Sequence, residues 1–138
     1  MARVLVVEDE PNISAIILFK LRREGHIVAH VETGAAARDA GEKWDMVLLD
    51  SSLPGEDALE LLAHFRGRFP VVVMTESLDE HTPAAAMAVG AVATVRKPFK
   101  PTVLARLVAD VTRFPKGDAH HSVEATADQL ITTVGAES

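Results

Sequence analysis

Short apolar runs alternate with segments of helical periodicity along most of the chain, and this alternation constrains the fold more than any other feature. Each run is bounded by turn residues or charged residues, as is typical of strands buried on both faces of a sheet. The predicted strands cover residues 3–7, 26–32, 45–50, 70–75 and 91–96. The predicted helices cover residues 11–24, 34–43, 58–65, 82–89 and 102–114.

This order of elements predicts a doubly wound α/β fold. The connections are too long for hairpins, and crossovers between parallel strands are right-handed, so five strands and five helices specify a parallel sheet covered on both faces. The flavodoxin-like strand order 2-1-3-4-5 is the simplest arrangement. In that order the first and third strands are neighbours at the topological switch point, where open parallel sheets place their ligands.

The first predicted helix carries more apolar residues than one face holds. Four of them are predicted to share the buried face: Ile13, Ile16, Ile17 and Leu21. Leu18 and Phe19 fall outside that face. Two interpretations stay open: they pack at the edges of the face, or they form an apolar surface for a partner.

At 138 residues the chain is long enough for one domain with its own core, predicted at 1–114, followed by a tail at 115–138. The absence of cysteine excludes a disulfide framework and a thiolate metal site. The N-terminus reaches acidic residues after a short apolar run, which predicts neither a signal peptide nor membrane insertion, and we expect a cytoplasmic protein. A net charge of −6 without a cluster of Lys and Arg argues against direct nucleic-acid binding.

Acidic residues follow the first and third predicted strands. Glu8 and Asp9 end the first strand, and Asp50 ends the third, shortly before a Pro54-Gly55 turn. Asp50 alone is open to four interpretations: a nucleophile, a metal ligand, a helix cap or a solvated loop charge. Because the two strands are predicted neighbours, the three carboxylates are expected to meet and to repel one another unless a cation lies between them. Mg²⁺ suits such a site because it prefers oxygen ligands.

Two further polar side chains end the remaining strands. Thr75 follows the fourth strand and offers a hydroxyl donor, and Lys97 follows the fifth and offers a compact positive charge. Together with Asp50 they are suited to hold a phosphoryl group, since phosphoryl transfer depends mainly on positioning and charge neutralisation and a carboxylate is a competent nucleophile.

Residues 3 to about 114 resemble the receiver domain of bacterial two-component response regulators, a CheY-like fold. The resemblance implies that Asp50 accepts the phosphoryl group and that Thr75 and Lys97 contact it. It also implies a cis peptide bond between Lys97 and Pro98.

The same resemblance implies a set of Mg²⁺ ligands. Asp9 and Asp50 bind the ion directly, Glu8 binds it through water, and the backbone carbonyl of Ser52 completes the protein ligands. The resemblance further implies that phosphate comes from a phosphohistidine on a sensor histidine kinase or a histidine phosphotransfer protein, and that the receiver catalyses its own phosphorylation and dephosphorylation. It also implies that output passes to a downstream protein target or a second copy of the chain.

Two residues depart from the family pattern. Glu76 stands where the family commonly has Ala or Gly, and a carboxylate there is expected to slow loading from small anionic donors. Thr94 stands where the family often has Tyr or Phe, so the usual aromatic switch is missing. The signal is instead expected to pass through the loop at residues 76–81 and the helix that contains Ala84, Ala85 and Ala86. Ser52 and Ser77 are small enough to leave room for an attacking water.

The tail holds one Lys against four acidic residues. Its apolar residues recur at helical intervals after a capping-box spacing between Thr126 and Gln129. A disordered end and a short amphipathic helix are both consistent with this pattern. The adjacent His120 and His121 are interpreted as incidental.

Three other functions are weighed against the receiver interpretation. An aspartate-nucleophile phosphatase needs a second Asp where Ser52 stands, and a flavin-binding carrier needs a polar, glycine-containing loop where the first strand ends in acids. A degenerate receiver that binds partners without phosphorylation is suggested only by Glu76 and Thr94. A receiver cut from a longer response regulator also remains an alternative.

Overall fold

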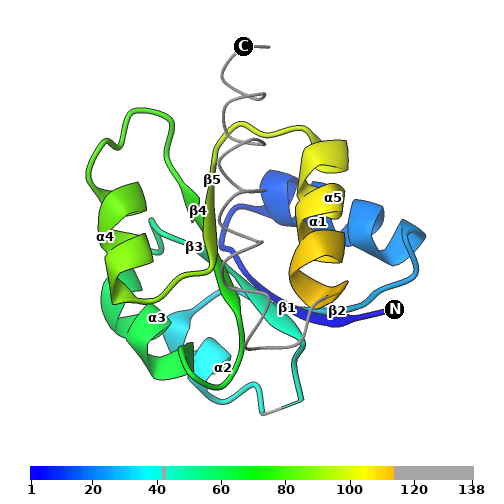
Figure 1. Ribbon diagram of the computed structural model, residues 1–138, viewed down its shortest axis with the longest axis horizontal. Helices are drawn as coiled ribbons and strands as arrows, with labels where there is room; N and C mark the ends of the chain where they lie inside the picture. The colour runs from blue at the N-terminus through cyan, green and yellow to red at the C-terminus, as the bar shows by residue number, and fades with distance from the viewer. Residues whose placement is uncertain (42, 114–138) are drawn as a thin grey trace.

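The computed structural model describes residues 1–41 and 43–113. Five parallel strands form one sheet in the order β2-β1-β3-β4-β5, which confirms the predicted topology (Figure 1). The strands are β1 (Arg3–Val7), β2 (Ile27–Val31), β3 (Met46–Asp50), β4 (Val71–Thr75) and β5 (Ala93–Arg96). The helices are α1 (Pro11–Arg23), α2 (Gly34–Arg38), α3 (Ala58–Phe65), α4 (Thr82–Val89) and α5 (Pro101–Arg113).

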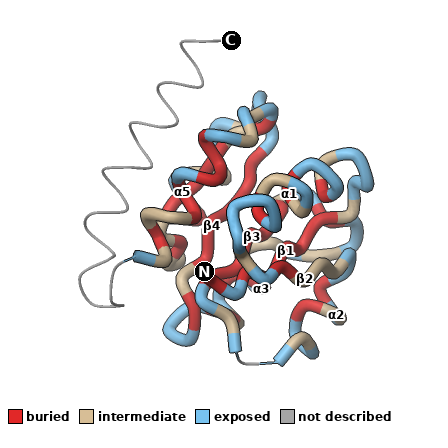
Figure 2. The backbone as a smooth tube through the Cα atoms, turned by 90° about the vertical axis from the view of Figure 1, so that its right-hand side faces the viewer, coloured by how far each residue is buried: buried red, intermediate tan, exposed pale blue. Residues whose placement is uncertain are grey.

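The helices divide between the two faces of the sheet. Helices α1 and α5 cover one face, and α2, α3 and α4 cover the other (Figure 1). Successive strand residues point to opposite faces, so Val4 and Val6 pack under α1 and α5 while Leu5 and Val7 pack against the other layer. The inner strands of the sheet are therefore buried on both sides, and the tube in Figure 2 shows β1, β3 and β4 as the buried centre of the domain.

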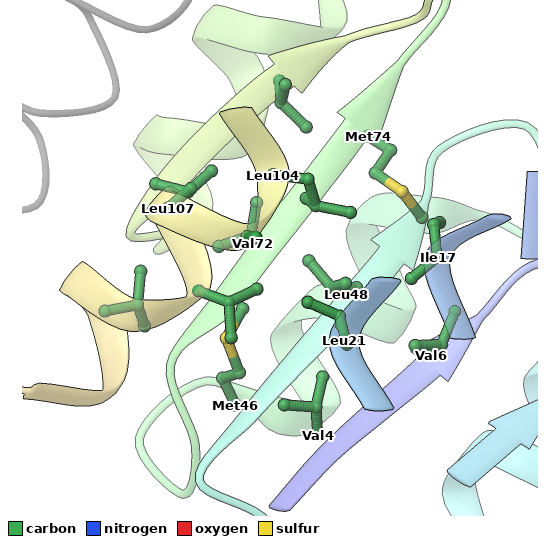
Figure 3. Close-up of a cluster of buried hydrophobic side chains, with 14 of the residues drawn as sticks. Val4, Val6, Ile17, Leu21, Met46, Leu48, Val72, Met74, Leu104 and Leu107 are labelled. Atoms are coloured by element: carbon green, nitrogen blue, oxygen red, sulfur yellow. The ribbon is translucent and has the colours of Figure 1, made fainter. Parts of the chain in front are cut away.

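The core beneath α1 and α5 shows why the apolar runs form central strands. Side chains from β1, β3 and β4 interdigitate with those of the two long helices in Figure 3. The labelled residues are Val4, Val6, Ile17, Leu21, Met46, Leu48, Val72, Met74, Leu104 and Leu107. Burying large side chains such as Leu21, Leu48 and Leu104 contributes roughly 1.5–3 kcal/mol each, so this layer fixes the sheet and the strand ends.

The prediction that Ile16 lies on the buried face of α1 is wrong, because 51% of its surface is exposed. The buried arc of the helix is centred on Ser14, Ile17 and Leu21, so it is turned toward Leu18 and away from Ile16. Leu18 packs at the edge of the core, as one of the two interpretations held, whereas Phe19 is 68% exposed. The contacts of α1 with β2 and α5 set this rotation, which periodicity alone does not define.

Helix α2 is shorter than predicted, ending at Arg38 instead of residue 43. Asp39 forms its C-cap, and Gly41 takes a left-handed φ of 91°, a backbone conformation that does not continue a helix. The Trp44 side chain donates a hydrogen bond to the Ala40 carbonyl at 3.2 Å, which satisfies a group that a longer helix would have used. The other described element boundaries agree with the prediction to within two residues.

The predicted tail, residues 115–138, lies outside the described residues, and so does Phe114. Among the helices that the structure describes, none is long and apolar enough to cross a membrane.

Candidate functional site

Strand register brings the predicted site residues together. Val7 of β1 lies opposite Leu49 of β3, so the next residues, Glu8 and Asp50, lie side by side at the carboxyl ends of the two strands. Thr75 ends β4 next to them, and Lys97 follows β5. Glu8, Asp50 and Thr75 are fully buried and Lys97 is 6% exposed. We call these four residues the inner cluster.

Lys97 connects the two acids of the inner cluster. Its Nζ lies 2.9 Å from Glu8 Oε1 and 3.1 Å from Asp50 Oδ1, and 3.8 Å from Glu10 Oε1. The Lys97 amide also donates to the Thr75 carbonyl at 2.8 Å, which ties the β5 end to the β4 end. The Lys97–Pro98 peptide bond is cis. Lys97 is therefore held against both carboxylates by side-chain and backbone contacts.

Three buried oxygens of the inner cluster have no hydrogen-bond partner among the described residues: Glu8 Oε2, Asp50 Oδ2 and Thr75 Oγ1. Buried polar atoms are rarely left unpaired, because each costs roughly 1–3 kcal/mol. Glu8, the half-buried Asp9 and Asp50 each offer a carboxylate oxygen within 4.8 Å of the others. This donor set fits a hard divalent cation such as Mg²⁺, which would satisfy the free carboxylate oxygens.

The protonation of the inner cluster reflects the same crowding. Burial, reinforced by the hydrogen bond to Asp50, raises the pKa of Glu8 from 4.5 to about 8, and Lys97 only partly offsets this. Burial alone would raise the pKa of Asp50, but hydrogen bonds with Glu8 and Lys97 outweigh it and the pKa is lowered. Burial would lower the pKa of Lys97, yet its hydrogen bonds to Glu8 and Asp50 raise it. In the absence of a metal, the raised pKa favours the protonated form of Glu8, which lowers the negative charge of the cluster.

Exposed residues border the inner cluster. Ser52 donates its backbone N–H to Asp50 Oδ1 at 3.2 Å, and its Oγ lies 3.1 Å from the same oxygen. Ser52 Oγ also lies 2.8 Å from Glu76 Oε1. We call the exposed residues Glu10, Ser52, Glu76 and Ser77 the rim.

A cavity of about 300 Å³ opens beside Lys97. Apolar side chains of α1 and of the segment after β5 form part of its wall, and the rim supplies acidic groups. Its lining residues are Glu10, Ile13, Ile16, Glu76, Ser77, Lys97, Pro98 and Phe99. The cavity therefore connects the surface with the Lys97 ammonium group, which contacts Asp50.

Ser77 and Thr94, two positions expected to influence the site or its switching, lie in different surroundings. Ser77 reaches the cavity, whereas Thr94 is buried within β5 and does not line it. The loop after β4 is fastened from β5, because Arg96 Nη1 donates to the carbonyls of Ser77 and Asp79 at 3.1 and 2.9 Å. Glu76 and Leu78 are exposed in this loop.

Some contacts of the site were missed at the level of sequence. Glu10 had no predicted role, but it approaches Lys97 and lines the cavity. The contact of Ser52 with Glu76 joins residues 24 positions apart, and no local pattern signals it. Arg96 directly precedes the predicted site residue Lys97. Its position at the end of a predicted strand is the sequence feature that could have indicated its contact with the loop after β4.

Comparison with known proteins gives one family. The family model of the response regulator receiver domain matches residues 4–109. A response regulator receiver protein from Burkholderia phymatum is 29% identical, with a TM-score of 0.74 over 83% of this chain and 98% of that chain.

Two further solved structures extend the comparison. NtrX from Brucella abortus is 28% identical, with a TM-score of 0.76 over 81% of this chain and 27% of that one. The BeF3-activated receiver domain of DrrB is 26% identical, with a TM-score of 0.75 over 83% of this chain and 99% of that one.

Proposed function

Because the chain belongs to the family of response regulator receiver domains, we propose that it accepts a phosphoryl group on Asp50 and signals by protein contact. The observation that carries this proposal is the buried Asp50 Oδ2, which has no hydrogen-bond partner among the described residues although Lys97 lies beside the other oxygen. A carboxylate with one free oxygen and a neighbouring cation is prepared for nucleophilic attack on phosphorus.

The proposed donor is a phosphohistidine of a sensor histidine kinase or histidine phosphotransfer protein. A carboxylate oxygen of Asp50 attacks the phosphorus, an O–P bond forms, and the N–P bond breaks with its electron pair left on the imidazole nitrogen. Lys97 keeps its positive charge near the transferred oxygens, and the unpartnered Thr75 hydroxyl is available to donate to one of them.

We assign the metal ligands to Asp9, Asp50 and the Ser52 carbonyl, with Glu8 acting through water. The support is the group of carboxylate oxygens within 4.8 Å and the free Glu8 and Asp50 oxygens. Bound Mg²⁺ supplies positive charge that neutralises the acids and the phosphoryl oxygens. The protein orients the phosphoryl group through its own side chains, because the ends of β1 and β3 hold Glu8 and Asp50 in contact with Lys97.

Reversal of the phosphorylation requires water to reach Asp50. The rim residues Ser52 and Ser77 have small side chains, and both are exposed. We propose that water attacks the phosphorus through this side and that the Asp50 carboxylate is the leaving group. The opening beside Ser77 and Lys97 supports this route.

The surface of α1 is the proposed contact for the phosphodonor protein. Phe19 is 68% exposed and, with Leu18, Arg22 and Arg23, borders a shallow groove, so it offers apolar surface flanked by positive charge. Output is assigned to α4, β5 and α5, where a downstream protein or a second copy would bind.

The test is transfer from a phosphorylated histidine phosphotransfer protein, followed by borohydride reduction and peptide mass mapping. Reduction converts an aspartyl phosphate to homoserine, so the modification is expected at position 50 of the native chain and nowhere in Asp50→Asn. Modification at another aspartate, or transfer that survives in Asp50→Asn, would show that Asp50 is not the acceptor.

A further inference from the structure

The Ser52 hydroxyl stands between two carboxylates. Its Oγ lies 2.8 Å from Glu76 Oε1 and 3.1 Å from Asp50 Oδ1. A hydroxyl has one proton to donate, so it serves one carboxylate at a time. Asp50 Oδ1 has two other donors, Lys97 Nζ and the Ser52 amide, and the contact with Glu76 is the shorter of the two. The Ser52 hydroxyl is therefore well placed to hold the Glu76 carboxylate next to the phosphoacceptor.

This hydrogen bond places a negative charge at the entrance to the site. Glu76 lines the same cavity as Lys97, and Glu10 adds a second acid to that wall. An incoming phosphoryl group needs the positive charge of Lys97 and also meets the Glu76 carboxylate. The cost of this repulsion grows with the negative charge of the donor. Because Glu76 is exposed, the bond with Ser52 is readily broken, so it slows a donor without excluding it.

We propose that Glu76, held by Ser52, is a specificity-determining residue that disfavours dianionic small-molecule phosphodonors relative to donors of lower net charge. This inference rests on the proposed function of Asp50 as acceptor. It goes beyond the presence of an acid at position 76, because it assigns the effect to the hydrogen bond with Ser52. A donor that brings a cation or a hydrogen-bond donor to Glu76 escapes the penalty.

The experiment measures phosphorylation rates of the full chain with Mg²⁺ by intact mass, using acetyl phosphate as the dianion and phosphoramidate as the donor with one net negative charge. Glu76→Gln removes the charge with little change of shape. We expect it to raise the acetyl phosphate rate about fivefold, on the order of the effect of one charge several ångströms from a dianion at a protein surface. The phosphoramidate rate is expected to rise less.

Two variants separate the hydrogen bond from general charge. Glu10→Gln removes one acid from the same cavity wall without touching Ser52, and it should change the acetyl phosphate rate much less than Glu76→Gln. Glu76→Asp keeps the charge but shortens the side chain by one methylene, so contact with Ser52 is lost and the rate should exceed that of the native chain.

Each other outcome overturns the inference. Equal effects of Glu76→Gln and Glu10→Gln, equal acceleration of both donors, or a Glu76→Asp rate equal to the native rate would remove the role of the Ser52 hydrogen bond. Failure of the proposed function gives a different result: the native chain would then gain no phosphoryl group on Asp50 from either donor.

Discussion

The inner cluster and the rim surround the same carboxylate but are built by different parts of the fold. Glu8, Asp50, Thr75 and Lys97 are buried at strand ends, where the pairing of β1 with β3 and the core under α1 and α5 fix their positions. Ser52, Glu76 and Ser77 are exposed in the loops that follow β3 and β4. Under the proposed function, acceptance of phosphate would depend on the buried strand ends, whereas the exposed loops around them would set which donors are used.

The charges of the two regions are also balanced differently. Within the inner cluster, two acids share one lysine, and burial raises the pKa of Glu8, so a further positive charge there would favour its ionised form. On the rim, Glu76 is exposed to water, and its charge needs no buried partner. Substitutions in the inner cluster should therefore change stability and chemistry together, and substitutions on the rim should change chemistry alone.

The largest effect is expected for Lys97→Met, which keeps the length of the side chain but removes its charge. Glu8 and Asp50 would remain buried without a cation, and breaking such a pair costs about 3 kcal/mol. Urea unfolding in the presence of a chelator measures this loss, with Lys43→Met, at an exposed position, as the control. Phosphorylation should slow by about 100-fold or more. Unchanged stability would mean that Lys97 does not balance the two acids.

A smaller effect is expected from pH in the metal-free protein. The folded-state pKa of Glu8, about 8, lies above its ordinary 4.5, so the folded state favours protonated Glu8. The resulting stability is complete below about pH 4.5 and is lost as the pH rises through about 8. The melting temperature should fall by on the order of 10 °C between pH 5 and 8 with a chelator.

Two controls assign that pH dependence to the inner cluster. Glu8→Gln mimics the protonated acid and should flatten the decline. Added Mg²⁺ should raise the melting temperature more at pH 8 than at pH 5, because the ion competes with the proton on Glu8. A decline of equal size in native protein and Glu8→Gln would place the titrating group elsewhere.

The smallest effect on stability is expected on the rim. Glu76→Gln should change the free energy of unfolding by less than about 0.5 kcal/mol, since the residue is exposed and its bond with Ser52 is open to water. Urea unfolding measured as for Lys97→Met gives a direct comparison. A loss as large as that of Lys97→Met would end the distinction between the inner cluster and the rim.

Much of the inner cluster was predictable from the sequence, because strand ends follow from short apolar runs and parallel strands bring their carboxyl ends to one edge. The sheet order and the convergence of Glu8, Asp9 and Asp50 agree with that reasoning. The contacts of Lys97 with both Glu8 and Asp50 depend on side-chain geometry, which strand order does not define.

The rim and the helix faces were less predictable. The bond between Ser52 and Glu76 arises from the meeting of two loops, and loop approach has no periodic signal. The rotation of α1 that exposes Ile16 depends on packing against β2 and α5. The early end of α2 coincides with the left-handed backbone of Gly41 and the Trp44 contact, although its short Ala-rich sequence alone favours continuation.

The central claim is that Asp50 accepts a phosphoryl group in a reaction that depends on a divalent cation. Intact mass after incubation with phosphoramidate tests it directly, for the native chain, Asp50→Asn and the exposed control Asp39→Asn, each with Mg²⁺ or with a chelator. The account predicts one added phosphoryl group on the native chain and on Asp39→Asn with Mg²⁺, and none on Asp50→Asn or with chelator. Addition that persists in Asp50→Asn, or no addition to the native chain under any condition, would contradict it.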